Sequence, residues 1–377
     1  MYTTRVVLVL VVLAAATLGG PGVGAVAAAD ADAEDCEFPL TRTDATGTAV
    51  TVPADPETVV TLNPSAAQTM YEIGAWDEVV GVSTYADYLP GADAKTTVGT
   101  GTDDATVERT LTLDPDLVLA PNTIPDSVVS RLRGVGLTVY KFEAAASMAD
   151  VVAKTRLTGA LVGACAGADD RADRMERELA VVEGAVADVE RPDVLYAFFG
   201  FTAGEDTFVH EVIETAGGNN VAADPDGANA SGRTTGYFAI SPEVVVASDP
   251  AWFVLNDDEY DRATVPSGPG GAYENTTAYR EGNAVVLDAN EISQPAPRLV
   301  GAILDLVEAL HPTVYETEIR DRIDREPTAT PSEPSTTAAT PTPTGTSTTG
   351  SAPGLGFGAP AAMLAVAALL AAARRRR

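Results

Sequence analysis

The chain has 377 residues and a formal net charge of −30, with 54 Asp and Glu residues against 24 Lys and Arg residues. Such a surface repels nucleic acid and other polyanions, which argues against a nucleic-acid-binding protein. Only three of the cations are lysines, Lys95, Lys141 and Lys154. An acidic, lysine-poor surface also keeps its hydration in concentrated salt, so the charge by itself does not indicate a ligand.

The first 29 residues have the layout of a secretory signal peptide. Arg5 stands before an apolar run over residues 6–18, and small residues follow at 27–29. This order predicts an exported protein from which the segment is removed. Cys36 does not directly follow the apolar run, so a lipid at the N-terminus is not expected.

Strands and helices are predicted to alternate over the next hundred residues. Residues 43–52 predict a hairpin with its turn at Thr46-Gly47. Short apolar runs then alternate with segments whose apolar residues recur at helical spacing. The expected strands are 58–62, 79–82, 117–120 and 137–140, and the expected helices are 65–73, 107–113 and 126–133. This alternation predicts a parallel sheet in an α/β lobe.

Residues 147–189 contain no proline and are rich in Ala, Arg, Glu and Leu. Apolar residues such as Leu157, Leu161 and Leu179 recur near a period of 3.6, which predicts one long connecting helix. Glycines at 159, 163 and 167 weaken its middle, so an interruption near 163–167 remains an alternative.

A second α/β pattern follows. The expected strands are 193–199, 252–255 and 284–287, and the expected helices are 208–216, 242–247 and 298–310. The order of these elements repeats that of the first half. In each half, a short helix bearing a glutamate is followed by Asp-Pro and then by a strand. These stretches read LTLDPDLVLA (111–120) and VVASDPAWFVL (245–255). The sequence therefore predicts an internal structural repeat.

The C-terminal region has two parts. Residues 327–352 are mainly Thr, Pro, Ser, Ala and Gly, which cannot bury apolar surface and predict an extended stalk. Residues 353–377 contain an apolar stretch long enough to cross a bilayer and end in four arginines. The alternative, a buried core helix, would require the stalk to fold back over the domain. This tail resembles the PGF-type sorting signals of archaeal surface proteins, in which a lipid replaces the helix, although PGLGF (353–357) has two residues inserted before the phenylalanine.

Cys36 and Cys165 are the two cysteines. An even pair in an exported protein favours a disulfide, and two free buried thiols are the alternative. Asn229 and Asn275 each begin a glycosylation sequon, as expected of a surface protein.

Five stretches together resemble the solute-binding proteins of ABC importers for cobalamin, iron-siderophores and haem. They are TLNPSAAQTMYEIGA (61–75), VVGVSTYADYLP (79–90), ERTLTLDPDLVLA (108–120), ETAGGNNV (214–221) and APRLVGAI (296–303). The resemblance covers about residues 40–312, and the acidic composition resembles that of haloarchaeal exported proteins. It implies an α/β fold with two Rossmann-like lobes joined by a long rigid helix, and a ligand cleft between the lobes.

The expected organisation therefore has seven parts: a signal peptide (1–29), an N-terminal segment with a hairpin (30–56), a first lobe (57–148), a connecting helix (149–190), a second lobe (191–312), a stalk (327–352) and an anchor (353–377). The resemblance implies a monomer that partners with an ABC permease and its ATPase. It implies no cofactor, and two histidines are too few for a His-rich metal site.

The resemblance also points to the ligand residues. In the cobalamin binders a tyrosine lies at the cleft in a Tyr-x-Asp-Tyr-Pro turn, and here the turn begins at Tyr85, with one leucine inserted before the proline. Tyr85 is expected to contact the ligand, the alternative being that it packs on its own lobe, while Asp87 and Tyr88 hold the turn. Phe201 either faces the ligand or lies in the core. Asn290 and Glu291 correspond to a third loop at the cleft, and Tyr273 is a further candidate.

Two glutamates are expected to serve docking. In the family, one glutamate on each lobe pairs with arginines of the permease, and the matching residues are Glu108 and Glu243. Each is predicted to open a short helix, so a carboxylate that stabilises the helix N-terminus is the alternative reading.

The function expected is therefore a surface-anchored binding protein that delivers cobalamin to a permease. A ferric-siderophore or haem binder of the same class is the first alternative, favoured by the glycine-rich loop 99–103. A structural surface protein or adhesin is an alternative of another class. An enzyme is not expected, because the chain has no HExxH, GxSxG or CxxC motif and only His210 and His311 as histidines.

Overall fold

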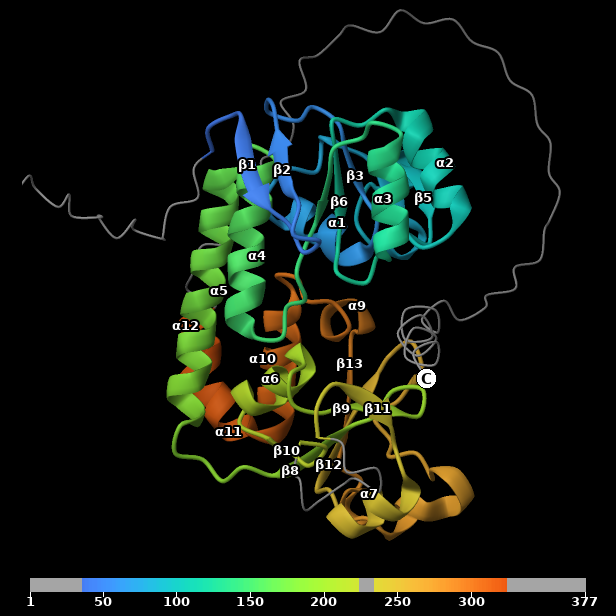
Figure 1. Ribbon diagram of the computed structural model, residues 1–377. Helices are drawn as coiled ribbons and strands as arrows, with labels where there is room; N and C mark the ends of the chain where they lie inside the picture. Colours follow the sequence, from blue (N-terminus) through green and yellow to red (C-terminus); the bar gives the residue numbers. More distant parts are fainter. Residues whose placement is uncertain (1–35, 224–233, 324–377) are drawn as a thin grey trace, which may run out of the picture. The chain divides into compact units, whose positions relative to one another are not determined.

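The computed structural model describes residues 36–223 and 234–323 (Figure 1). The predictions for the signal peptide, the stalk, the anchor and the Asn229 sequon lie outside the described residues. Within them, no helix combines the length and the apolar character that crossing a membrane requires.

The first lobe is built on a five-stranded parallel sheet in the order β5-β4-β3-β6-β7. The strands are β3 (Val59–Thr61), β4 (Val79–Ser83), β5 (Thr96–Gly99), β6 (Leu117–Ala120) and β7 (Val139–Lys141). The intervening helices are α1 (Pro64–Glu72), α2 (Asp104–Leu113) and α3 (Asp126–Gly134). Every residue of β6 is buried, as expected of a parallel strand covered on both faces.

A hairpin of β1 (Leu40–Thr43) and β2 (Ala49–Val52) precedes this sheet and confirms the predicted turn. Asp44 in the turn is 4% exposed and pairs with Arg133 of α3. Its carboxylate also accepts a hydrogen bond from the Lys141 amide at 3.0 Å. The hairpin is thereby fixed to the first lobe.

The second lobe has a four-stranded parallel sheet in the order β10-β8-β12-β13. Its strands are β8 (Asp193–Tyr196), β10 (Asn219–Asn220), β12 (Trp252–Asn256) and β13 (Ala284–Leu287). A two-stranded antiparallel sheet pairs β9 (Phe201–Ala203) with β11 (Tyr237–Ala239). The helices of this lobe are α6 (Phe208–Thr215), α7 (Pro242–Ser248), α8 (Thr277–Glu281), α9 (Ala289–Ile292) and α10 (Leu299–Leu310).

The chain continues past α10 through α11 (Pro312–Val314), a π-helical turn (Tyr315–Ile319) and α12 (Arg320–Ile323). Ile319 is fully buried in the core of the second lobe, so this lobe extends beyond residue 312.

The two sheets repeat one another. The order β4-β3-β6-β7 in the first corresponds to β10-β8-β12-β13 in the second. The helices that precede β6 and β12 both end at a left-handed aspartate, Asp114 (φ 46°, ψ 54°) and Asp249 (φ 42°, ψ 56°), followed by a proline. The structure confirms the predicted internal repeat at the level of backbone geometry.

The connection between the lobes is a pair of helices, α4 (Met148–Leu161) and α5 (Cys165–Val186), which lie side by side (Figure 1). A single continuous helix over 149–190 is therefore wrong, and the interruption falls at residues 162–164. Gly163 turns the chain there with φ +70°, a conformation that side chains rarely adopt.

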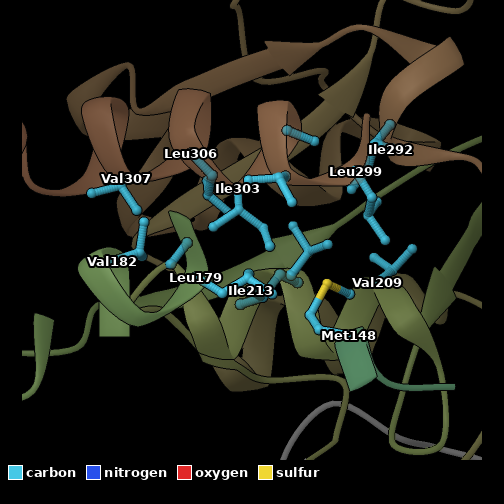
Figure 2. Packing of buried hydrophobic residues seen from close by; sticks show 14 of the residues in the cluster. Met148, Leu179, Val182, Val209, Ile213, Ile292, Leu299, Ile303, Leu306 and Val307 are labelled. Carbon is cyan, nitrogen blue, oxygen red and sulfur yellow. The ribbon is translucent and has the colours of Figure 1, made fainter. Parts of the chain in front are cut away.

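Both helices contribute to the cores of both lobes. Met148 of α4 and Leu179 of α5 lie in the core cluster of the second lobe, whereas Ala160 and Ala168 lie in that of the first. Figure 2 shows the second-lobe cluster, in which side chains of α10 face those of α5 and α6. Two packed helices resist bending more than a peptide linker does.

The disulfide between Cys36 and Cys165 is present, as predicted, with Cα atoms 6.0 Å apart. It ties the segment before β1 to the first turn of α5 and closes a loop with a sequence separation of 129 residues.

Candidate functional site

Loops from the C-terminal ends of strands in both sheets meet between the lobes. Residues 84–90 follow β4, and residues 288–294 follow β13. The Tyr88 hydroxyl of the first loop donates a hydrogen bond to Gln294 Oε1 of the second, at 3.0 Å. In open α/β folds, ligands bind outside the carboxyl ends of parallel strands, so this junction is the candidate site.

Gln68 of α1 connects these loops and has no exposed surface. Its Nε2 donates to Tyr88 Oη and to the carbonyl oxygen of Asn290, each at 3.0 Å. Its Oε1 accepts from the Arg298 amide, also at 3.0 Å. One buried amide of the first lobe therefore holds the second-lobe segment 290–298 at both of its ends.

Charged residues reinforce the same contact. Glu72 of α1 accepts from Arg298 Nε at 2.7 Å and from Arg171 Nε of α5 at 3.2 Å. Arg171 also donates to the Pro297 carbonyl at 2.8 Å, and the Arg298 guanidinium lies 5.4 Å from the ring centre of Tyr71. The hydrogen bonds and partly desolvated ion pairs fix the second lobe to α1.

Lys154 of α4 is 8% exposed and belongs to the same junction. Its Nζ donates to the Pro295 carbonyl at 3.0 Å and to Ser65 Oγ at 3.4 Å. The ammonium lies 5.7 Å from the ring centre of Phe142. Burial lowers the pKa of Lys154 to about 8, because the charged form loses its hydration.

Tyr85 lies on the turn after β4 and is partly exposed. Its side chain joins none of the core clusters and forms no hydrogen bond with another described residue, whereas Tyr88 packs on the first-lobe core. Partial burial and the nearby charge of Asp103 raise the pKa of Tyr85, so the phenol stays neutral near pH 7. A large, partly exposed ring outside the core clusters of the described residues is suited to contact with a ligand.

The loop after β8 is a two-residue hairpin turn. Phe199 and Gly200 have φ values of 46° and 79°, and the amides and carbonyls of Phe198 and Phe201 bond to each other at 2.7 and 3.0 Å. A bulky side chain is rarely found at positive φ, and such strain concentrates at functional sites. The Phe199 amide donates to the carboxylate of Glu259, which helps to hold the turn.

Hydrogen bonds continue from this turn to the junction. Glu259 belongs to the loop after β12, where Asp257 Oδ1 accepts from the Ala289 amide at 2.8 Å. Asn256 Nδ2, at the end of β12, donates to Ser293 Oγ at 3.1 Å. The loops after β8, β12 and β13 thus form one connected edge that meets Gln68 and Tyr88.

The predicted ligand residues of the second lobe differ in their contacts. Asn290 contacts the first lobe through its carbonyl oxygen. Glu291 turns its carboxylate onto Gly301 of α10, where the absence of a Cβ leaves it room. Burial, with Asp288 and Asp305 nearby, raises the pKa of Glu291 to about 7. Phe201 is partly buried, with its ring centre 6.1 Å from that of Phe198.

Tyr273 lies mostly inside the second lobe. It is 6% exposed and packs in a second-lobe core cluster, with its ring centre 5.4 Å from that of Phe253. Gly268 allows this, because a Cβ there would collide with the tyrosine ring. Tyr273 therefore packs in the core, and its contact with a ligand stays a prediction.

The predicted docking glutamates are both exposed, but only one opens its helix. Glu243 lies in the first turn of α7, where its carboxylate accepts from Ser241 Oγ at 2.8 Å. Glu108 lies in the second turn of α2, since that helix begins at Asp104 with Asp103 as its cap. The expectation that Glu108 opens a helix is wrong, and stabilisation of the N-terminus does not account for it.

Two surface hollows of the described chain lie elsewhere. One, of about 260 Å³, is lined by residues including Val186 and Glu214, and the other, of about 430 Å³, by residues including Trp252 and His311. Asp193 and Trp252, which line the second, begin β8 and β12, at the opposite strand ends from the junction. Within the described residues, no group of three or more His, Cys, Asp or Glu side chains is placed to hold a metal ion.

Comparison with known proteins gives a family and a fold. A sequence model described as "Periplasmic binding protein" matches residues 59–291. A "Cobalamin-binding protein" of Halobacterium salinarum is 43% identical over 319 residues, which are 83% of this chain and 85% of that protein.

Two solved structures share the fold. The apo haem-binding protein RhuT of Roseiflexus sp. RS-1 aligns with a TM-score of 0.60 and 24% identity, covering 68% of this chain and 99% of that one. The vitamin B12-binding protein BtuF of Vibrio cholerae aligns with a TM-score of 0.58 and 21% identity, covering 70% and 100%.

Proposed function

Because the chain belongs to the periplasmic binding protein family, we propose that it captures cobalamin outside the cell and delivers it to the permease of an ABC importer. Family membership makes the chain a solute-binding protein rather than an enzyme, and nothing favours the adhesin alternative. The observation that carries the choice of ligand is the 43% identity to a cobalamin-binding protein across most of both chains.

The geometry that supports this proposal is one partly exposed aromatic residue on a strand-end loop of each lobe. Tyr85 would present its ring from the first lobe, and Phe199, whose ring also packs against the second-lobe core, would present its exposed edge from the turn after β8. An aromatic face covers a large flat macrocycle with little loss of side-chain entropy, because only two side-chain torsions are fixed. Phe201, Asn290 and Glu291 remain proposed neighbours of the ligand.

Haem or a ferric siderophore is the second candidate, because the Tyr85 oxygen has no partner among the described residues and tyrosinate is an iron ligand. Partial burial raises the pKa of Tyr85, so its free phenol is neutral and iron would have to displace the proton. The glycine-rich loop 99–103 does not favour iron either. Gly99 and Gly101 have φ values of 119° and 85°, and a Cβ on Gly101 would collide with the Leu62 carbonyl. These glycines are therefore explained by the backbone.

Little closure of the lobes is expected on binding. α4 and α5 run through both cores, and Gln68, Glu72 and Lys154 already join the lobes without a ligand. The protein would then meet its permease with Glu108 and Glu243, one from each lobe, paired with cationic side chains. A C-terminal anchor over residues 353–377 would keep it at the cell surface as a monomer.

The proposed ligand contact is tested by titrating the purified protein with cyanocobalamin. Tyr85→Ala should weaken binding at least tenfold, or about 1.4 kcal/mol. Tyr279→Ala, which removes an exposed tyrosine of α8, should bind like the wild type. Equal affinity of the Tyr85 variant and the wild type would remove Tyr85 from the site.

The docking role is tested separately in cells. Glu108→Arg combined with Glu243→Arg should leave the affinity for cobalamin unchanged and abolish uptake, because each substitution places like charges face to face. Normal uptake by this variant would refute the pairing.

A further inference from the structure

The helices α2 and α7 occupy equivalent places in the two lobes. Each leads into the strand that pairs with the central β3 or β8, and each ends at a left-handed aspartate. The four residues before each aspartate, 110–113 and 245–248, follow the same burial order. The first is buried, the next two are exposed and the last is half-buried. The two helices therefore present the same faces to solvent.

On that common face each helix carries an exposed glutamate and an exposed large apolar residue. Glu108 and Glu243 lie six residues before the aspartates, and Leu111 and Val246 lie three residues before them. Residues three apart on a helix are neighbours on its surface. Leu111 is 44% exposed and Val246 is 37% exposed.

A single exposed apolar residue needs no explanation, since soluble proteins have many. The described residues have four large hydrophobic residues in the exposed class, Leu111, Val135, Val246 and Tyr279. Leu111 and Val246 differ from the other two because each has an exposed carboxylate one helical turn before it. The same pair of chemical groups at equivalent positions of both lobes indicates one recognition surface used twice.

Resting on the proposed function, we propose that Leu111 and Val246 form the apolar half of the permease-docking surface. The partner would be a permease with two-fold related halves, each offering a cationic side chain and an apolar contact about one helical turn away. Glutamate would orient the complex and the apolar residue would supply buried area, as in interfaces with an apolar centre and a charged rim.

Other occupants fit the surface less well. A second copy of the chain would bring acidic patches of the same sign together, at a cost in electrostatic energy. An anionic membrane surface would repel the same glutamates in a chain of net charge −30. A partner with cations beside apolar side chains has neither penalty.

The test uses the full chain expressed in cells that lack their own copy, with uptake of radiolabelled cyanocobalamin as the readout. The variant is Leu111→Gln with Val246→Gln, because glutamine keeps helix propensity while removing the apolar surface. The matched control is Val135→Gln with Tyr279→Gln, which removes equally exposed apolar residues that have no carboxylate three residues before them.

The docking variant should bind cyanocobalamin with wild-type affinity and melt within about 2 °C of the wild type, yet reduce uptake at least tenfold, while the control keeps uptake within twofold. Wild-type uptake by the docking variant, or an equal loss in the control, would overturn the proposal. So would sedimentation showing a wild-type dimer that the variant abolishes. Failure of the wild type to bind cyanocobalamin or to restore uptake would instead refute the proposed function.

Discussion

Lys154 offers the most quantitative test of how the lobes are joined. Its ammonium lies at the contact of α4 with Ser65 and the Pro295 carbonyl, and no carboxylate of the described residues forms an ion pair with it. The pKa falls from 10.5 to about 8 on folding. Since one pKa unit corresponds to about 1.4 kcal/mol, burial of the charged form costs about 3 kcal/mol at pH 7.

The sign of the pH dependence follows from proton binding. Between pH 8 and 10.5 the unfolded chain holds a proton on Lys154 that the folded chain has lost. The free energy of unfolding therefore rises with pH through that window. Below pH 8 the full cost of burying the charged Lys154 is present. By pH 9.5 the cost has fallen to about 1 kcal/mol.

Lys154→Met should remove this dependence. The free energy of unfolding of the variant minus that of the wild type should fall by about 2 kcal/mol between pH 7 and pH 9.5. The two acceptors that lose their donor each cost roughly 1 kcal/mol at every pH and so do not change the slope. Denaturant unfolding at fixed high salt, measured at both pH values, gives the comparison.

Lys141→Met is the matched control, because it removes one ammonium that pairs with the exposed carboxylate of Asp126. If the free energy of unfolding of Lys154→Met minus that of the wild type stays constant within about 0.5 kcal/mol between pH 7 and pH 9.5, burial of the charged amine does not destabilise the fold as expected. The same fall in both variants would assign the effect to net charge rather than to the buried amine.

Two further predictions concern the helices that join the lobes. Cys36→Ser with Cys165→Ser should lower the free energy of unfolding by up to about 5 kcal/mol, because the disulfide closes a loop of 129 residues in the unfolded chain; a loss below about 1 kcal/mol in denaturant unfolding would contradict this. Gly167→Ala should destabilise by about 1–3 kcal/mol, since its Cβ would collide with the Ile73 carbonyl of the first lobe. Gly184→Ala on the same helix meets no neighbouring atom and should stabilise by about 0.5–1 kcal/mol, and equal effects would refute this close contact.

Much of the fold could be predicted because its strands are short apolar runs between turn signals. The strands at 117–120 and 284–287 were bounded correctly, since each is an apolar run flanked by Asp, Pro or Gly. β5 escaped prediction because its first two residues, Thr96 and Thr97, are exposed and give no apolar run. The short strands β9 and β11 pair across 34 residues, which no local pattern indicates.

The candidate site was less predictable, because its polar contacts join residues far apart in sequence. Gln68 and Asn290 are 222 positions apart, and nothing in the sequence of α1 marks Gln68 as a contact between lobes. Phe199 is distinguished by its positive φ, which the following glycine could have suggested as a tight turn. The burial of Tyr273 was not predictable, because a glycine-rich loop can also fold an aromatic ring into the core.

Calorimetric titration of the purified chain with cyanocobalamin, haemin and a ferric siderophore tests the proposed function most directly. We expect saturable one-to-one binding of cyanocobalamin and no heat of binding with the two iron compounds. Binding of haemin or the siderophore without cyanocobalamin would contradict the choice of ligand, and the absence of binding to all three would contradict the proposed role in cobalamin capture.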